Sequence, residues 1–254
     1  MADDIYVKRL DVVDSTNRYV RDEATLLWGE AHGCNAVAVT ANHQTSGRGQ
    51  RGNVWASEQG KNLLMTLLVR PDCLLEAANQ FLLSQTVAVA LHAAMKCYGI
   101  DTRLKWPNDI YVGDRKLAGI LIELDYCGAC VEQAIIGIGL NVNQSIFPPM
   151  DKVPVSMKML LGHDTDVDNV LGSVLDCFSH YYNEMKLCGK TIAAEYRELL
   201  LGFGEERTFA DAEGLFTAVI EDIEPTGHLL LRRADGILSR YAFKEVEMLL
   251  TQTP

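Results

Sequence analysis

The chain has 254 residues, of which 48% are hydrophobic and 22% charged, and its formal net charge is −11. This balance predicts a globular protein with a sizeable core, and it weighs against a general nucleic-acid binder, which depends on lysine and arginine. No apolar run approaches the ~18 residues that a membrane span needs, and the N-terminal residues lack the apolar stretch of a signal peptide. With seven cysteines at irregular spacing, we expect reduced thiols and a cytoplasmic protein.

The first half of the chain predicts several strands and two helices. Residues 5–13 alternate apolar and polar side chains, as a half-buried strand does. The segment DSTN, residues 14–17, is expected to begin a helix with Asp14 or Ser15 as its N-cap. The following elements are a strand over 35–41, a strand over 62–70, a helix over 74–98, and four short strands in TRLKW, DIYVG, KLAGILIEL and CVEQAIIGIGL.

In the second half of the chain, the sequence pattern changes near residue 202. Helices are predicted over 166–188 and 190–201, and after them come short strands separated by tight turns, the rhythm of a small β-barrel. We therefore predict two domains, 1–202 and 203–254. The larger one mixes helices with a largely antiparallel sheet, which is an α+β arrangement.

The loop QTSGRGQRGNVW, residues 44–55, is the most unusual stretch. Its glycines permit close approach of the backbone to a ligand, and its arginines suit an anion such as a phosphate. Trp55 offers a flat face for a base or an apolar chain. A flexible loop with solvated arginines is the alternative. The glycines and arginines concerned are Gly47, Arg48, Gly49, Arg51 and Gly52.

A second stretch, KWPNDIYVGDRKLAGILIE, begins at Lys105. Pro107 should interrupt the strand, which leaves the side chains of Asn108 and Asp109 free to point into a cleft. The hairpin that follows would bring Asp109 close to Lys116. Such a pair suits a reaction that develops negative charge and deprotonates an amine, although a surface ion pair is the simpler alternative.

Three shorter motifs complete the survey. In GIGLNVN, residues 137–143, Asn141 carries both a donor and an acceptor that match the edge of a base, or it merely ends a strand. The hydroxyls of Ser15 and Thr16 either cap a helix or bond a small polar ring. Cys127 and Cys130 form a C-x-x-C without a second pair, which favours an ordinary turn over a zinc site.

Taken together and in this order, these stretches resemble the biotin protein ligase family. The resemblance is strong over roughly 9–143 and looser over 144–200, and the C-terminal segment is similar to that family's SH3-like barrel. It implies a class II synthetase-like catalytic domain. The stretches that carry it are STN, QTSGRGQRGNVW, KWPNDIYVGDRKLAG and GIGLNVN.

The resemblance implies a reaction in two steps. Biotin and ATP, with Mg²⁺, would form biotinyl-5′-AMP and pyrophosphate, and a lysine of a biotin carboxyl carrier domain would then take the biotinyl group. Many family members carry an additional N-terminal helix-turn-helix. Here DSTN begins at residue 14, so we expect a short form that does not bind DNA. Family members often dimerise through the main sheet, and the sequence leaves the oligomeric state open.

The resemblance also assigns residues. Catalysis is expected from Lys116, Asp109 and Arg48, with Asp109 as a candidate proton acceptor for the incoming lysine. The metal ligands stay unassigned. Biotin is expected at Ser15, Thr16, Gln44, Gly47, Arg48, Lys116 and Gly119, and the nucleotide at Gly49, Gln50, Arg51, Trp55, Asn108 and Asn141. One departure stands out, because Gln50 occupies a position where the family often has an arginine, and it cannot offer a charged fork.

Three alternatives stay open at this stage. A lipoate or octanoate ligase of related fold is the nearest enzymatic one, although the tryptophan-bearing loop and KWPND favour biotin. A nucleic-acid-binding regulator would use the Arg–Gly loop, against which the acidic charge speaks. A biotin-binding module without catalysis is the third. The segment VSMKML, residues 155–160, is similar to the acceptor sequence of biotin carrier domains, but its pattern predicts a short helix rather than an acceptor hairpin.

Overall fold

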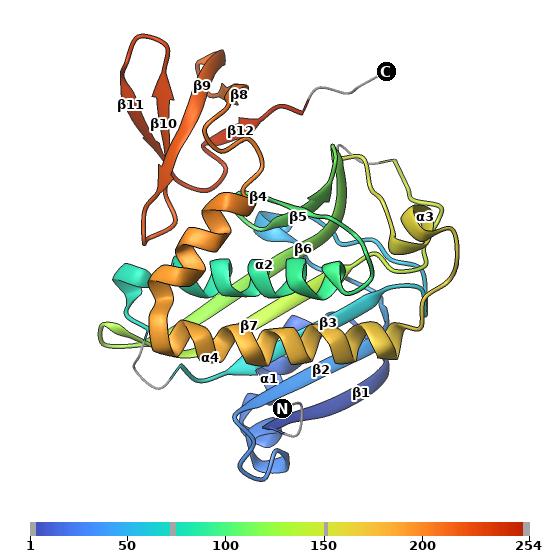
Figure 1. Ribbon diagram of the computed structural model, residues 1–254. Helices are drawn as coiled ribbons and strands as arrows, with labels where there is room; N and C mark the ends of the chain where they lie inside the picture. The colour runs from blue at the N-terminus through green and yellow to red at the C-terminus, as the bar shows by residue number, and fades with distance from the viewer. Residues whose placement is uncertain (1–3, 72–74, 150–151, 251–254) are drawn as a thin grey trace.

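The computed structural model describes residues 4–71, 75–149 and 152–250 (Figure 1). Its strands are β1 Ile5–Val13, β2 Ala36–Gln44, β3 Leu63–Val69, β4 Arg103–Lys105, β5 Asp109–Val112, β6 Arg115–Cys127, β7 Cys130–Leu140, β8 Glu206–Asp211, β9 Gly214–Ile223, β10 Leu229–Arg233, β11 Leu238–Tyr241 and β12 Val246–Met248. Its helices are α1 Thr16–Glu30, α2 Phe81–Lys96, α3 Met157–Leu161 and α4 Val167–Leu199, with 3-10 turns η2 Gln50–Gly52 and η3 Ala77–Asn79.

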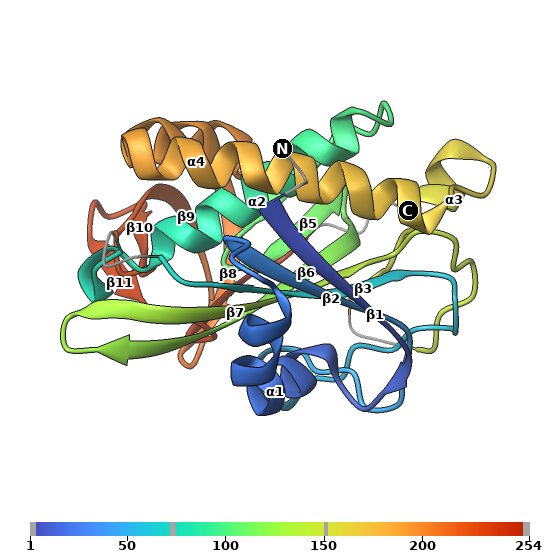
Figure 2. The same cartoon turned by 90° about the horizontal axis from the view of Figure 1, so that it is seen from below.

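The main sheet lies between two layers of helix. In the described residues its strand order is β1-β2-β3-β7-β6-β5-β4, in which β1 and β2 run parallel and all other neighbours run antiparallel. Figure 2 shows α1 on one face and α2 with α4 on the other. The predicted α+β class with a mixed, largely antiparallel sheet is confirmed.

The central strand β3 explains why the sheet is covered on both sides. All seven of its residues, LLMTLLV, are buried. A strand that is buried throughout needs cover on both faces of the sheet. Its one polar residue, Thr66, has no exposed surface. A buried hydroxyl must find hydrogen-bond partners, and the partners of Thr66 lie in the site described below.

The helix predicted over 74–98 is wrong at its beginning. Leu74 lies outside the described residues, and α2 itself begins only at Phe81, after the short turn η3. Contacts from distant segments replace the first helical hydrogen bonds, because Ala77 N–H donates to Ala129 O and Phe81 N–H donates to Pro225 O. Apolar spacing alone does not reveal such competition.

The helices predicted over 166–188 and 190–201 form α4, which bends where the two predictions meet. Cys188 has φ −153° and ψ 77°, values outside the helical region. The next residue, Gly189, packs closely on α2, because a Cβ there would lie 2.6 Å from Leu82 Cδ2. A larger residue at this position would require the Leu82 side chain to move.

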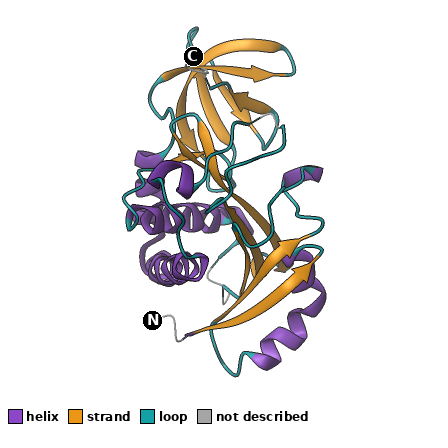
Figure 3. Cartoon of the chain, turned by 90° about the vertical axis from the view of Figure 1, so that its right-hand side faces the viewer, coloured by secondary structure: helices purple, strands orange, loops and turns teal. Residues whose placement is uncertain are grey.

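The C-terminal strands form a second, antiparallel sheet in the order β11-β10-β9-β8-β12. Its outer strands β11 and β12 do not pair with each other in the described part of the chain, so the sheet is open. It sits at one end of the molecule (Figure 3). The two sheets share one continuous hydrophobic core, which includes Phe81, Tyr196 and Phe209.

Two sequence predictions from outside the site are also settled. Cys127 and Cys130 face each other across the β6–β7 turn, as an ordinary hairpin requires. The segment around Lys158 is the helix α3, and Lys158 Nζ lies 2.7 Å from Asp164. None of the described helices is long and apolar enough to cross a membrane.

Candidate active site

A cleft of about 1590 Å³ lies between the main sheet and the C-terminal sheet. All four sequence motifs reach it, because the ends of β2, β6 and β7 and the loops beside them meet at this edge. Twelve of the predicted site residues line it, namely Ser15, Thr16, Gln44, Arg48, Gly49, Gln50, Trp55, Asn108, Asp109, Lys116, Gly119 and Asn141.

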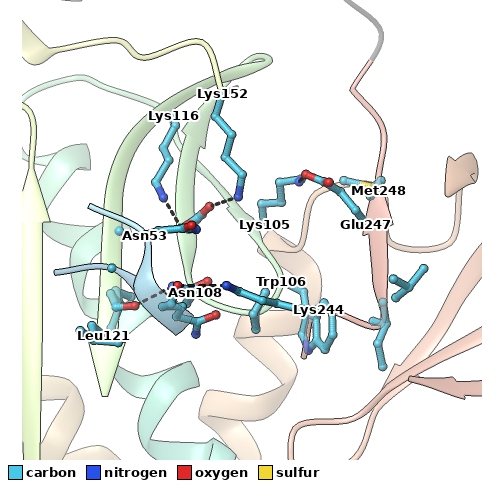
Figure 4. Close-up of a pocket in the computed structure, with 18 of the residues that line it drawn as sticks. Asn53, Lys105, Trp106, Asn108, Lys116, Leu121, Lys152, Lys244, Glu247 and Met248 are labelled. Carbon is cyan, nitrogen blue, oxygen red and sulfur yellow. Dashed lines mark hydrogen bonds and ion pairs between the residues drawn. The ribbon is translucent and has the colours of Figure 1, made fainter. Parts of the chain in front are cut away.

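The electrostatic centre of the cleft is a buried carboxylate held by two lysines. Asp109, which is 4% exposed, lies 2.6 Å from Lys116 Nζ and 3.0 Å from Lys152 Nζ. Figure 4 shows the side chains of Lys116 and Lys152 side by side in the cleft, each ending at a dashed line that marks its ion pair. Burial alone would raise the pKa of Asp109, but the two ammonium groups outweigh it and hold the pKa below its ordinary value. Asp109 is therefore ionised at neutral pH, with a lysine nitrogen beside each of its oxygens.

Local geometry explains the pair that the sequence predicted. Asp109 begins β5 and Lys116 lies on β6, and the tight turn between these strands contains Gly113 with φ +60°. A turn of this kind brings residues on the two strands together. Lys152 was not predicted. It belongs to a loop beyond β7, and no local pattern marks it.

A polar network closes the other end of the cleft. Thr16 donates its backbone N–H and its hydroxyl to Gln44 Oε1, over 2.7 and 3.0 Å. Thr66 Oγ1 lies 2.8 Å from Thr16 Oγ1 and donates to Asn17 Oδ1 over 2.7 Å. Ser15 occupies the N-cap position of α1 without capping it through its side chain. The hydroxyl of Thr16 therefore orients the Gln44 side chain and does not cap a helix.

The floor of the cleft is built from glycines, and Trp55 lies on it. Gly119 and Gly139 are paired across β6 and β7. A Cβ on Gly139 would lie 2.4 Å from the Trp55 ring, and one on Gly119 would lie 3.1 Å from it. Only glycine leaves room for the indole. Lys116 Nζ lies 5.6 Å from the centre of the same ring, within reach of a cation–π contact.

Trp55 connects the residues predicted to bind the nucleotide with those predicted to bind biotin. It was assigned to the nucleotide and Gly119 to biotin, yet the two are in contact. Trp55 Nε1 is buried and has no hydrogen-bond partner among the described residues. A buried donor of this kind needs an acceptor, which a ligand in the cleft would provide.

Several predicted ligand contacts are engaged within the protein instead. Asn141 Nδ2 donates to Val155 O over 3.1 Å, and Asn108 Nδ2 donates to Ile120 O over 2.6 Å. Both amides thus hold backbone segments in place while their residues line the cleft. Gly47 supports the loop from behind, because Trp55 N–H donates to its carbonyl.

Of the two arginines in the loop, the structure describes the side chain of Arg48. Arg48 is half exposed, and its Nη1 lies 3.7 Å from Glu123 Oε1. Gln50 contributes its backbone carbonyl, which accepts a hydrogen bond from Lys244 Nζ over 3.0 Å. The side chain of Arg51 lies outside the part of the chain that the structure describes.

Lys105 is a further cation that sequence reasoning left unassigned. It is 7% exposed, and its Nζ lies 4.0 Å from Glu247 Oε1 on β12. Burial lowers the pKa of Lys105 to about 8, and repulsion by Lys152 adds to this. The pairing of Lys105 with Glu247 ties the C-terminal sheet to the centre of the cleft.

The lowered pKa of Lys105 makes stability depend on pH. Below about pH 8 Lys105 is charged in both the folded and the unfolded state, and folding carries the full desolvation penalty. Between there and the unfolded pKa, near ~10.4, only the unfolded chain keeps the proton, so stability rises with pH. We expect the free energy of unfolding of the wild type, relative to that of Lys105→Met, to rise by roughly 2 kcal/mol between about pH 7.5 and 10. Urea unfolding of both proteins across this range measures it. A difference that stays constant with pH would contradict the expectation.

The fold and the cleft define an α+β protein with a carboxylate–lysine cluster beside a floor of glycines. Residues 10–141 match the model of the biotin/lipoate A/B protein ligase family. The chain is 33% identical over 236 residues to the bifunctional ligase/repressor BirA of Bacillus subtilis, covering 91% of this chain and 71% of that protein. It is 33% identical over 235 residues to the biotin--[acetyl-CoA-carboxylase] ligase of Paracoccus denitrificans, covering 88% and 92%.

A solved structure agrees with these relatives. Biotin protein ligase from Aquifex aeolicus, in complex with biotin and ATP, superposes with a TM-score of 0.78 at 27% identity, over 97% of this chain and 99% of that one. The protein therefore belongs to the biotin/lipoate A/B protein ligase family.

Proposed function

We propose that this protein is an ATP-dependent ligase that activates biotin as biotinyl-5′-AMP and transfers it to a lysine of a biotin carboxyl carrier domain. Membership of the family supports the reaction class. The observation that carries the proposal is the cluster of Asp109, Lys116 and Lys152 beside the glycine floor. In the proposed reaction, the positive charge of this cluster would lie where a carboxylate and a polyphosphate meet.

In the first step, a biotin carboxylate oxygen attacks the α-phosphorus of ATP. The new C–O–P linkage forms as the bond to pyrophosphate breaks. Both reactants are anions, so the protein must reduce their repulsion, and fixed cations in a partly dry cleft do this well. We assign this task to Lys116, with support from Lys152 and Arg48.

Magnesium is proposed to enter as part of the substrate MgATP. Among residues 4–71, 75–149 and 152–250, no group of three His, Cys, Asp or Glu side chains is arranged to hold a metal ion. Mg²⁺ is commonly held by substrate phosphates with few protein ligands. The phosphates of ATP are therefore its main ligands in this proposal.

In the second step, the amine of the carrier lysine attacks the acyl carbon and AMP leaves. The amine loses a proton in this step, which passes to water in the open cleft. Asp109 was the sequence-based candidate to accept it, but its lowered pKa makes it a weak base, and each of its oxygens faces an ammonium group. We propose instead that Asp109 positions Lys116 and Lys152.

Biotin is proposed to bind with its ring at the polar end and its carboxylate toward Lys116. Gln44 Oε1 accepts two hydrogen bonds from Thr16. The Gln44 amide nitrogen would therefore donate to the ureido carbonyl. Ser15 would contact the same ring, and Gly119 would form the floor. Gly47 would support this end indirectly, through the loop.

The nucleotide is proposed to lie between the Gly–Arg loop and the C-terminal sheet. Gly49 and Gln50 would present backbone groups to it, Arg51 would supply charge, and Trp55 a flat face. Asn108 and Asn141 would offer their side-chain oxygens to it, since each amide nitrogen donates to a backbone carbonyl.

We expect Arg48→Ala to reduce biotin-dependent pyrophosphate release more than Gln50→Ala does. Arg48→Ala removes a charged group that lines the cleft. Losing one charge-assisted contact of this kind should lower the rate about tenfold. Gln50→Ala keeps the backbone carbonyl, which is the atom that Lys244 contacts, and we expect a change within about threefold. Equal or reversed losses would contradict this assignment.

We further propose the domain division 1–202 and 203–254, with an SH3-like C-terminal unit. The end of α4 at Leu199 and the start of β8 at Glu206 support the boundary. A cytoplasmic protein without DNA-binding activity, and dimerisation through the main sheet, are part of the same proposal. Gel filtration and a gel shift at low salt test them, where retarded DNA would favour the regulator.

The substrate acid separates this proposal from the nearest alternative. Pyrophosphate release is measured with ATP, Mg²⁺ and either biotin, lipoate or octanoate. We expect release with biotin alone, because Gln44 and Thr16 form a polar end that an aliphatic chain leaves unpaired. Release with lipoate or octanoate but not biotin would support a ligase for those acids, and no release with any acid would support a binding module.

A further inference from the structure

A turn of the C-terminal sheet is anchored beside the Gly–Arg loop. Phe243 packs between Phe81 and Trp106, with ring centres 6.0 and 5.4 Å away. Trp106 Nε1 donates to Gly227 O over 2.9 Å, which fixes the same sheet a second time. The residue after Phe243 is therefore held in a defined place at the edge of the cleft.

That residue, Lys244, has a backbone conformation unusual for a side chain. Its φ is +68°, in the left-handed region that favours glycine. The turn holds it there, because Ala242 N–H donates to Glu245 Oε2 and Glu245 N–H donates to Ala242 O. Non-glycine residues that keep such strain cluster at functional sites. Glycine would fit this position with less strain.

Lys244 also differs from the other cations of the cleft in its partner. Among the described lysines and arginines that line the cleft, every other one has a carboxylate within 4.0 Å, whereas Lys244 Nζ contacts only a neutral carbonyl, that of Gln50. The paired cations are Arg48 with Glu123, Lys105 with Glu247, Lys116 and Lys152 with Asp109, Arg233 with Asp211, and Arg240 with Glu224.

We infer that Lys244 binds the polyphosphate of the nucleotide, so that the C-terminal sheet supplies a cation to the site. This inference rests on the proposed function. An exposed ammonium on a neutral carbonyl keeps most of its capacity to bind an anion, and charge-assisted bonds to phosphate are stronger than bonds to a carbonyl. Figure 4 shows Lys244 reaching the cleft beside Trp106. Since Gln50 is neutral, Lys244 provides the positive charge at this point of the loop.

The test compares binding of two probes to Lys244→Gly in the presence of saturating biotin. The probes are α,β-methylene-ATP, which cannot be cleaved at the reacting bond, and adenosine, which has no phosphate. Glycine removes the charge while suiting the backbone conformation, so thermal unfolding should stay at or above the wild-type midpoint. We expect affinity for the ATP analogue to fall about tenfold and affinity for adenosine to stay unchanged.

Arg240→Gln is the matched control. It removes a cation from the same sheet and cleft, but one already paired with Glu224, and its affinity for the analogue should change by less than about threefold. Equal weakening of both probes in Lys244→Gly would mean that Lys244 only holds the loop, and unchanged binding of both would remove its role altogether. Either outcome overturns the inference. If the wild-type protein releases no pyrophosphate with biotin, that result contradicts the proposed function itself.

Discussion

Replacing Lys116 by methionine is expected to lower biotin-dependent pyrophosphate release by about a hundred- to a thousandfold, the usual effect of removing one preorganised charge from a transition state. Lys116 Nζ lies in the cleft, 2.6 Å from Asp109 and above the glycine floor. Methionine keeps most of the side-chain length and its packing against Trp55. The loss should therefore appear chiefly in the rate, with a smaller change in the KM for biotin.

The ion pair Lys158–Asp164 offers a matched control for this change. Its nitrogen–oxygen distance of 2.7 Å is similar, but both side chains are at least one-third exposed, at 38% and 61%, and neither lines the cleft. Lys158→Met should stay within about twofold of wild type. A comparable loss in both variants, or a loss below about tenfold in Lys116→Met, would contradict the role of Lys116.

Replacing Asp109 by asparagine is expected to lower the free energy of unfolding by about 3 kcal/mol, since it leaves two buried or half-buried ammonium groups without a counter-charge. The carboxylate faces Lys116 and Lys152. Removing one member of such a cluster exposes the full desolvation cost of the others. Adenylation should fall as well, because the two lysines would lose their fixed positions.

The pH dependence of this loss follows from the lowered pKa of Asp109. A carboxylate with a lower pKa in the folded state stabilises the fold above its unfolded pKa, near ~3.9, and the contribution disappears as pH falls through the folded value. The difference between wild type and Asp109→Asn in urea unfolding should therefore hold from neutral pH down to about pH 4 and close only below it.

Asp164→Asn is the control, with an expected loss below about 1 kcal/mol because its ion pair with Lys158 is exposed. If Asp109→Asn is no less stable than Asp164→Asn, the buried cluster does not hold this edge of the cleft together, and the assignment of Asp109 as a positioning residue is wrong.

The parts of the site that the sequence predicted are those that local geometry controls. Asp109 and Lys116 meet because a short hairpin joins them, and hairpin signals are readable over a few residues. The strands β3 and β7 were also predicted from short local patterns of apolar residues.

The parts that escaped prediction depend on segments far apart in the chain. Lys152 reaches Asp109 across 43 residues, and Lys244 reaches Gln50 across 194. No periodicity encodes such contacts, since tertiary packing decides them. The late start of α2 has the same origin, because Phe81 N–H bonds to Pro225 O in the turn between β9 and β10.

Asn141 shows a different limit of sequence reasoning. Its amide can serve a ligand or a backbone segment equally well, and its residue type does not distinguish the two. The structure assigns its Nδ2 to Val155 O. Only the position of the loop after β7 decides between the alternatives, and that position depends on the whole fold.

Intact-mass analysis of an acceptor protein tests the proposed reaction most directly. The protein is incubated in catalytic amount with biotin, ATP, Mg²⁺ and an apo biotin carboxyl carrier domain, and a carrier with its acceptor lysine changed to arginine is the control. We predict that the carrier gains the mass of one biotinyl group, that the arginine carrier gains none, and that Lys116→Met slows the gain. A carrier that stays unmodified with biotin, or one that is modified only when lipoate or octanoate replaces biotin, would contradict the proposal.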